Sequence, residues 1–353
     1  MTWVLGVDSG GSGLRVALAP VAAPVRDESV RPGSADSASA DSGPVTAGPF
    51  TSEPAVSRVP VRTGVRGIEA AHLLEQLLPM AGELLARAGG GAVSAVAVGA
   101  AGMATLGDDL RAELPAALDR SLGVRRLALA ADGVTAYAGA LGQRPGAVVA
   151  AGTGMIALGT DLHRWRRADG WGHLLGDCGG GAWIGRAGLE AGMRAYDGRR
   201  GGSAALLERL EAVFGPAAGL PGAVYPRSDR PAVLASFAPE VARCAPTDPV
   251  AAAILRDAAR QIAQSAAAVC PAESAESGTG CEVALTGGLF KMGDPLLTPV
   301  REELSALLPY ARPVPAAGDP LVGAVRIASA LATGSLRLPV HPQLLHVVAE
   351  QDT

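Results

Sequence analysis

The chain has 353 residues, of which 48% are apolar and only 3% aromatic, and its formal net charge is −4. This length predicts about two domains, with cores built mainly from Ala, Val and Leu side chains. The slightly acidic balance gives no electrostatic footprint for nucleic acid or an anionic membrane, so neither partner is expected.

The sequence contains no pattern of secretion, membrane insertion or cysteine chemistry. Its first residues enter an apolar strand directly, without a signal peptide, and no run of about 18 apolar residues predicts a membrane span. The four cysteines lack C-x-x-C spacing, so neither a zinc site nor a disulfide framework is indicated. They are Cys178, Cys244, Cys270 and Cys281. We therefore expect a cytoplasmic protein in a reducing environment.

Residues 3–19 are predicted to form a β-hairpin. Its first strand ends at Asp8, and its turn has the sequence Ser9-Gly10-Gly11-Ser12-Gly13. Glycines let the backbone approach a ligand closely, and the exposed N–H groups of such a turn form an anion site. Asp8 beside this turn is suited to hold Mg²⁺, while an Asx-turn is the structural alternative.

The remainder of the first half alternates strands with helices. The stretch from Asp27 to Pro54 is rich in Ser, Ala, Gly, Pro and Asp, which predicts a flexible insert. The elements predicted after it are a strand at Ala55–Val61, a helix at Ile68–Ala88, a strand at Val93–Val98, a helix at Asp108–Leu118, a strand at Arg126–Ala131 and a helix at Gly133–Leu141.

Asp132 stands between the last of these strands and the following helix. A carboxylate at the end of a buried strand can accept the proton of a substrate hydroxyl. It can also cap the N-terminus of the helix that follows. The two roles are compatible.

The second half begins by repeating the pattern of the first hairpin. Val148 to Leu158 read as two apolar strands joined by Gly152-Thr153-Gly154. Two such turns in corresponding places of two half-chains suggest two phosphate-facing hairpins that hold one nucleotide.

Residues 170–185 hold seven glycines, two tryptophans, a His and an Asp. This composition predicts a loop that leads into a helix near Gly181. Trp171 could stack on a sugar or brace the loop, and Asp177 could bind substrate hydroxyls or cap the helix. His173 is equally suited to a structural and a catalytic role.

Helices and one strand complete the chain. Thr286-Gly287-Gly288, after the strand, could place backbone against adenine or form an ordinary strand-to-helix turn. The predicted elements are helices at Ala182–Tyr196, Ser203–Phe214, Pro231–Cys244 and Pro249–Val269, a strand at Glu282–Leu285 and a helix at Pro320–Ala332. The alternation predicts a mostly parallel α/β sheet in each half, with ligands at the carboxyl ends of the strands.

These segments, in this order, resemble the BadF/BadG/BcrA/BcrD ATPase family and, within it, the N-acetylglucosamine kinases. The resemblance spans Val4 to Ala332 apart from the insert. It implies an α/β fold of two actin-like ATPase (ribonuclease H-like) domains with a nucleotide cleft between them. The first domain would comprise residues 1–141 and the helix 320–334, the second residues 142–319, and residues 335–353 would form a tail.

The resemblance also implies a reaction and a role for each motif. The activity would be transfer of a phosphoryl group from ATP-Mg²⁺ to a hydroxyl, the 6-OH, of an amino sugar or related hexose such as N-acetylglucosamine or glucosamine. Asp132 would be the catalytic base and Asp8 would hold the metal. The implied phosphate-binding residues are Ser9, Gly10, Gly11, Ser12, Gly13, Gly152, Thr153 and Gly154. Those for adenosine are Thr286, Gly287 and Gly288, and those for the sugar are Arg66, Gly170, Trp171 and Asp177. We also expect a homodimer.

The chain departs from the family at the sugar-binding Asn positions. Thr63–Arg66 and Met155–Ile156 occupy the corresponding regions, and the chain contains no Asn. Two other functions of this fold therefore stay open. One is a catalytically weak sugar sensor or regulator. The other is an ATPase that activates a 2-hydroxyacyl-CoA dehydratase, which needs cysteines for an iron–sulfur cluster shared across a dimer; only Cys178 lies in a Gly-rich loop.

Overall fold

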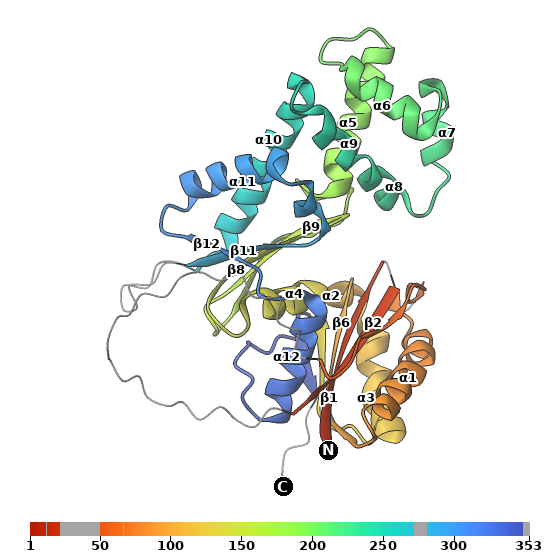
Figure 1. Cartoon of the computed structure of the whole chain (residues 1–353), viewed down its shortest axis with the longest axis vertical. Coiled ribbons are helices and arrows are strands. Elements are labelled where there is room, and N and C mark those ends of the chain that lie inside the picture. The colour runs from red at the N-terminus through yellow and green to blue at the C-terminus, as the bar shows by residue number, and fades with distance from the viewer. Residues whose placement is uncertain (12, 22–49, 66, 272–280, 349–353) are drawn as a thin grey trace. The chain divides into compact units, whose positions relative to one another are not determined.

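The computed structural model describes residues 1–11, 13–21, 50–65, 67–271 and 281–348, which form two compact units (Figure 1). Unit 1 comprises Met1–Thr135 and Pro320–Thr353, and unit 2 comprises Ala136–Asp319. The chain leaves unit 1 within helix α4 (Asp132–Leu141) and re-enters it at helix α12 (Pro320–Ala332). Most of the predicted insert, together with Ser12 and Arg66, lies outside the described residues.

Unit 1 is built on a six-stranded sheet with the strand order β13-β7-β6-β1-β2-β3. β1, β6 and β7 are parallel, and the other pairings are antiparallel. The bounds are β1 Thr2–Gly10, β2 Gly13–Pro20, β3 Ala55–Ser57, β6 Ala92–Ala100, β7 Leu127–Ala131 and β13 Leu345–Val348. A separate two-stranded ladder pairs β4 (Thr63–Gly64) with β5 (Gly67–Ile68).

Helices cover both faces of this sheet. Figure 1 shows α1 (Ala70–Arg87) and α3 (Asp108–Leu122) on one side of the strands and α12 on the other. α12 packs so closely that a Cβ on Gly6 would lie 2.7 Å from the backbone nitrogen of Val325. Burial on both faces explains why the central strands are almost entirely apolar. The short helix α2 (Met103–Leu106) follows β6.

Unit 2 contains a five-stranded sheet with the order β10-β9-β8-β11-β12. Its strands are β8 Gly146–Ala151, β9 Met155–Thr160, β10 Trp165–Asp169, β11 Glu282–Thr286 and β12 Arg312–Pro315. Its α-helices are α5 Gly181–Tyr196, α6 Ala204–Phe214, α7 Leu220–Val224, α8 Arg230–Ser236, α9 Ala238–Cys244, α10 Pro249–Val269 and α11 Asp294–Leu307. Two 3₁₀-helices, η1 (Ala217–Gly219) and η2 (Gly288–Met292), complete it.

The two sheets share one topology. In unit 1 the order β3-β2-β1-β6-β7 has an antiparallel hairpin side and a parallel side, and β10-β9-β8-β11-β12 of unit 2 has the same directions. The sequence repeat between the two Gly-turn hairpins is therefore a repeat of the whole sheet. The predicted α/β class with two related domains is confirmed, but each sheet is mixed rather than mostly parallel.

Several predicted elements have different bounds. The helix predicted at Pro231–Cys244 is two helices, α8 and α9, because Pro239 has no backbone N–H to continue the hydrogen-bond ladder between them. The strand predicted at Ala55–Val61 ends at Ser57, shortly before Pro60. The predicted tail contains β13, which pairs antiparallel with β7.

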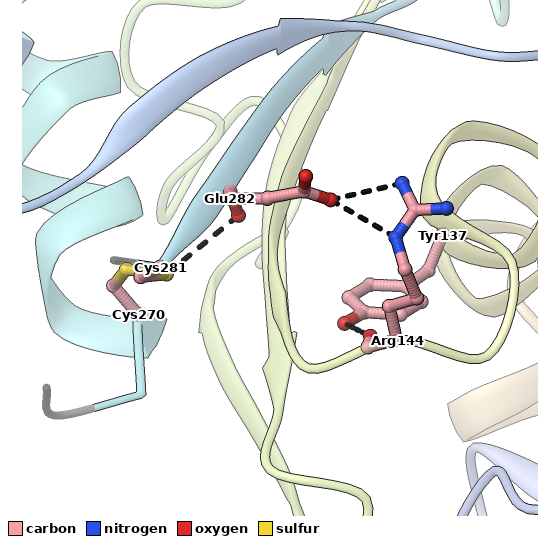
Figure 2. The surroundings of a disulfide bond; sticks show 5 residues. All are labelled: Tyr137, Arg144, Cys270, Cys281 and Glu282. Carbon is pink, nitrogen blue, oxygen red and sulfur yellow. Dashed lines mark hydrogen bonds and ion pairs between the residues drawn. A yellow bond between two sulfur atoms is a disulfide. The ribbon is translucent and has the colours of Figure 1, made fainter. Parts of the chain in front are cut away.

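The prediction that the cysteines form no disulfide was wrong, because Cys270 and Cys281 form a disulfide bond (Figure 2). Cys270 directly follows α10 and Cys281 directly precedes β11, with 6.6 Å between their Cα atoms. Glu282, the next residue, accepts hydrogen bonds from Arg144 on a neighbouring loop (Figure 2) and from Arg312. The pairing has no sequence signature, since the fold alone brings the two element ends together. The other two cysteines are free thiols.

We predict that removing this disulfide weakens unit 2. The bond closes a segment with a sequence separation of 11, and the chain-entropy model assigns about 3 kcal/mol to a loop of this size. The double substitution Cys270→Ser and Cys281→Ser should lower the free energy of unfolding by about that amount. Denaturant titration with and without reductant measures it: reductant should weaken the wild type and leave the double variant unchanged. Equal wild-type stability in both conditions would contradict the prediction.

Among the described residues, no helix combines the length and the apolar character that crossing a bilayer requires.

Candidate active site

Two predicted acidic residues lie at one edge of the unit 1 sheet. In the strand register, Ser9 pairs with Ala100, and Ala100 pairs with Ala131. Ser9, Ala100 and Ala131 thus lie in one row across the three strands. Asp8 comes one residue before Ser9 in the chain, and Asp132 comes one residue after Ala131. Because only β6 separates β1 from β7, the two carboxyl-bearing residues are two strand spacings, about 10 Å, apart across the sheet. Both belong to the carboxyl edge of the parallel strands, where ligands bind in such sheets.

Asp132 is exposed and begins α4. Its Oδ1 accepts a hydrogen bond from the Gly133 N–H at 2.9 Å, and its carbonyl oxygen accepts one from Thr135 Oγ1 at 2.9 Å. The first turn of α4 fits against β6 because Gly99 has no Cβ, which would lie 2.7 Å from Thr135 Oγ1. The side chain is thus oriented by the helix start and stays accessible, as a base that meets a substrate requires.

Asp8 is paired with Arg15, which faces it across the β1–β2 hairpin. Arg15 donates from Nε at 3.0 Å and from Nη2 at 2.6 Å, both to Asp8 Oδ2. The guanidinium fixes the carboxylate beside the first Gly turn and adds a positive charge there. Sequence reasoning did not assign Arg15 a role.

The first Gly turn closes between Gly10 and Gly13. Gly13 has a φ of +125°, and a Cβ there would lie 2.0 Å from the Ser57 carbonyl oxygen, so glycine is required. Cβ atoms on Gly10 and Gly11 would meet no atom within 4 Å. The tip of this turn therefore leaves room for a ligand close to the backbone, as an anion site needs.

In unit 2, the second Gly turn lies against the predicted adenosine turn. Thr286 of β11 pairs with Ala150 of β8. Gly287, at φ +107°, comes so close to the hairpin that a Cβ would lie 2.1 Å from the Ala151 carbonyl oxygen. A Cβ on Gly152 or Gly288 would instead meet nothing within 4 Å. Open space therefore lies next to both Gly152 and Gly288.

The same turn also supports the start of α5. The N–H of Gly181 donates to the Gly152 carbonyl at 2.9 Å, and the N–H of Ala182 donates to the Thr153 carbonyl at 2.8 Å. Gly180, the N-cap residue, approaches so closely that a Cβ would lie 2.8 Å from the Gly154 carbonyl carbon. The glycines of this segment are therefore needed for the close packing of helix and turn.

Asp177 faces the second Gly turn. A Cβ on Gly154 would lie 2.3 Å from Asp177 Oδ2, and Asp177 Oδ1 accepts a hydrogen bond from the Gly172 N–H at 3.1 Å. Its side chain does not cap α5, because Gly180 is the N-cap and α5 has no side-chain cap. The capping alternative is thus wrong for Asp177, and its half-buried carboxylate lies beside the phosphate turn.

Arg167 covers one face of the Trp171 ring, and most of the residue is exposed. The guanidinium carbon of Arg167 lies 4.3 Å from the ring centroid, while 62% of the Trp171 surface is accessible. Arg167 also donates from Nε to the Asp169 carbonyl at 3.0 Å and from Nη2 to the Gly170 carbonyl. Such a cation–π contact holds the ring in place. Bracing and stacking on a sugar, the two predicted roles, are therefore compatible.

The structure brings the predicted residues together in two sets, one in each unit. Unit 1 holds Asp8, Ser9, Gly10, Gly11, Gly13 and Asp132 at the carboxyl edge of its sheet. Unit 2 holds Gly152, Thr153, Gly154, Gly170, Trp171, Asp177, Thr286, Gly287 and Gly288 around the β8–β9 turn. Sequence reasoning missed Asp169, whose signal was available: it ends a strand directly before a glycine, and Asp132 likewise stands between a strand and a glycine.

Burial raises the pKa of the Asp177 carboxyl above 3.8, and the nearby charge of Asp169 raises it further, although the Gly172 N–H and the His173 charge oppose the shift. Between the unfolded and the folded pKa, the native protein holds more protons than the unfolded chain. Its stability therefore falls as pH rises through that window, and the ionised carboxylate costs stability at neutral pH.

We predict that Asp177→Asn gains in relative thermal stability as pH rises, because the amide does not ionise. The melting temperature of the variant minus that of the wild type should be more positive at about pH 7 than at about pH 4. Differential scanning calorimetry at both pH values measures this. Asp161→Asn is the control, because the pKa of Asp161 is lowered rather than raised. A difference that shrinks as pH rises would contradict the prediction.

The chain is similar to a known protein family, to a curated kinase and to solved structures. The model of the BadF/BadG/BcrA/BcrD ATPase family matches residues 5–328. An N-acetylmuramic acid/N-acetylglucosamine kinase from Clostridium acetobutylicum is 38% identical over 82 residues, which are 23% of this chain and 27% of that kinase. The chain thus spans about a quarter of this curated relative in the match.

Two solved structures resemble the chain over nearly its whole length. A putative N-acetylglucosamine kinase from Chromobacterium violaceum is 26% identical, with a TM-score of 0.59, and the match covers 92% of this chain and 97% of the other. A putative N-acetylglucosamine kinase from Porphyromonas gingivalis shares the fold at 16% identity, with a TM-score of 0.61 and coverage of 94% and 99%.

Proposed function

Because the chain belongs to the BadF/BadG/BcrA/BcrD ATPase family, we propose that it is an ATP-dependent sugar kinase. It would transfer the γ-phosphoryl group of ATP to the 6-OH of an amino sugar or related hexose. One observation carries this proposal: Gly287 packs on Ala151, directly before the Gly152–Gly154 turn, and Asp177 faces Gly154 of the same turn. A nucleotide on the two turns would thus have its phosphates beside a carboxylate suited to binding sugar hydroxyls.

The nucleotide would bind mainly through backbone. The open space at Gly10, Gly11 and Gly152 would leave room for phosphate oxygens, and the backbone N–H groups of such turns are suited to anions. Gly288 leaves the same kind of space for the adenosine. Arg15 adds a cation near the first turn, where it can offset phosphate charge.

Asp8 is the residue proposed to hold Mg²⁺. Mg²⁺ sites commonly use one or two carboxylates together with substrate phosphates and waters, so a single carboxylate beside a phosphate turn fits the ion. Arg15 keeps that carboxylate in place. When bound, the ion would neutralise charge on the phosphates during transfer.

Asp132 is the proposed general base. Its exposed carboxylate, oriented by the Gly133 N–H, would accept the proton of the sugar hydroxyl as that oxygen attacks the γ-phosphorus and ADP leaves. Asp177 would accept hydrogen bonds from other sugar hydroxyls, and the open face of Trp171 would stack on the ring. With no Asn in the chain, carboxylates and backbone groups would recognise the hydroxyls.

The cellular location of the protein is proposed from the reaction. A kinase works where ATP is available, so we place the protein in the cytoplasm. The expected homodimer stays a prediction, which sedimentation equilibrium would test.

ADP release with a panel of sugars tests the proposed function. The panel should include glucose, mannose, galactose, glucosamine, N-acetylglucosamine and N-acetylmuramic acid. We expect at least one of them to stimulate ADP release far above the rate with ATP alone. No stimulation across the panel would contradict a sugar kinase, and tight sugar binding without turnover would favour the sensor. Iron and sulfide in anaerobically purified protein would favour the dehydratase activator.

A further inference from the structure

Asp169, the last residue of β10, places a second carboxylate beside Asp177. Its Oδ1 accepts a hydrogen bond from the Asp177 N–H at 2.5 Å, and its Oδ2 accepts one from the Cys178 N–H at 2.9 Å. Both carboxylate oxygens are therefore used on the backbone at the far end of the Gly-rich loop. The proposed reaction gives Asp169 no role of its own.

The chain around Asp169 is shaped to admit this carboxylate. A Cβ on Gly176 would lie 2.3 Å from Asp169 Oδ1, so glycine clears the place that the carboxylate fills. Asp169 and Asp177 both adopt left-handed backbone conformations, with φ of +59° and +56°. Such conformations in residues other than glycine persist only where surrounding contacts hold them. The two hydrogen bonds that the Asp169 carboxylate accepts supply contacts of this kind.

These bonds join the two ends of the segment that carries Trp171. At one end, Arg167 binds the carbonyl oxygens of Asp169 and Gly170 and covers Trp171. At the other end, the Asp169 carboxylate holds Asp177. The backbone position of Asp177 then sets its side chain against the phosphate turn at Gly154.

We propose that Asp169 is a positioning residue, whose carboxylate fixes the backbone at Asp177 and thereby the side chain that binds the sugar. The proposal rests on the proposed function for its effect on sugar binding. Its geometric part concerns the protein without ligands.

Asp169 also acts on Asp177 through its charge. The charged and titratable groups that interact with Asp177 or its neighbour Cys178 are Asp169, His173 and Arg186. Asp169 is the negative one among them and raises the pKa of Asp177. Replacing its carboxylate by a neutral group should therefore lower the pKa of Asp177. A residue that only braced the loop would not change this pKa.

Asp169→Asn is the first test. An amide offers one acceptor, so one of the two backbone N–H groups loses its partner. We expect the KM for the sugar to rise by about tenfold or more, with a smaller change in kcat and in the KM for ATP. The acid limb of kcat/KM for the sugar should move to lower pH. Asp161→Asn is the control for a neutralised loop aspartate. Its Oδ1 alone accepts both backbone N–H groups, from His163 and Arg164, so the amide keeps both bonds and the KM for the sugar should not change.

Gly176→Ala separates geometry from charge and serves if Asp169→Asn does not fold. Its methyl group would displace the Asp169 carboxylate without neutralising it, and would also lie 3.0 Å from Trp171 Cβ. The KM for the sugar should rise as in Asp169→Asn, without the move of the acid limb to lower pH. An unchanged KM for the sugar in both variants, or an equal rise of the KM for ATP, would overturn the positioning role.

Two measurements without substrates keep this proposal distinct from the proposed function. In the wild type, hydrogen exchange should show protected amides at Asp177 and Cys178, and Asp169→Asn should lose that protection. Carboxyl NMR titration should show a lower pKa for Asp177 in the variant. If the wild type phosphorylates no sugar, the proposed function fails and these readouts still decide the geometry. Unprotected amides in the wild type would overturn it.

Discussion

Asp132→Asn should lower kcat by about 10²- to 10⁴-fold, the usual contribution of a general base. The amide keeps the size of the side chain and can still accept a hydrogen bond from the Gly133 N–H, so the start of α4 should stay intact. The KM values for ATP and sugar should therefore change little. Steady-state kinetics at saturating ATP, with ADP release as the readout, measures the loss.

Asp119→Asn is the matched control in the same unit. Asp119 is an exposed aspartate paired with Arg125 at 3.6 Å, away from the strand ends that carry Asp8 and Asp132. Its substitution should leave kcat unchanged. If Asp132→Asn also kept the wild-type kcat, Asp132 would be a helix cap alone, and the base would have to be another group.

Gly287→Ala should cause the largest loss of stability among single substitutions at the predicted nucleotide turns. Gly287 has φ +107° and ψ 167°, a conformation that is essentially restricted to glycine. A Cβ would also lie 2.1 Å from the Ala151 carbonyl oxygen. Backbone strain of about 1–3 kcal/mol and the steric clash add, so thermal unfolding should occur several degrees lower. Purified protein that folds should also bind ATP more weakly, because the turn must move away from β8.

Gly288→Ala is the neighbouring control. A Cβ there meets nothing within 4 Å, so the melting temperature should stay close to the wild-type value. If the adenosine lies over this residue, the KM for ATP should rise without loss of stability. Equal melting temperatures of the two variants would contradict the close packing of Gly287 on Ala151.

Local chemistry in the sequence predicted the parts of the site that are continuous in the chain. The two Gly-turn hairpins, the strand end before Asp132 and the turn after Glu282–Leu285 follow from apolar runs that end in Gly, Ser or Asp. Their repetition predicted a hairpin in each half, and β1–β2 and β8–β9 are these two hairpins. The relation between the two whole sheets was implied by the family resemblance, and the shared five-strand order confirms it. Each of these features depends on the backbone preferences of a few adjacent residues.

Features that depend on contacts between distant segments could not be predicted in this way. The Cys270–Cys281 bond forms because the end of α10 lies beside the start of β11. Asp169 accepts hydrogen bonds from backbone N–H groups eight and nine residues later in the chain. β13 pairs with β7, although the two strands are far apart in the sequence. The break at Phe237 between α8 and α9 was local, since Pro239 could have indicated it.

Identification of the product tests the central claim most directly. The chain should be incubated with ATP, Mg²⁺ and the sugar that stimulates ADP release, and the mixture examined by ³¹P–¹H NMR and mass spectrometry. We predict a phosphate monoester on C6 of the sugar, formed in equal amount to ADP and absent with Asp132→Asn. ADP accompanied by inorganic phosphate, with no phosphorylated sugar, would contradict the account.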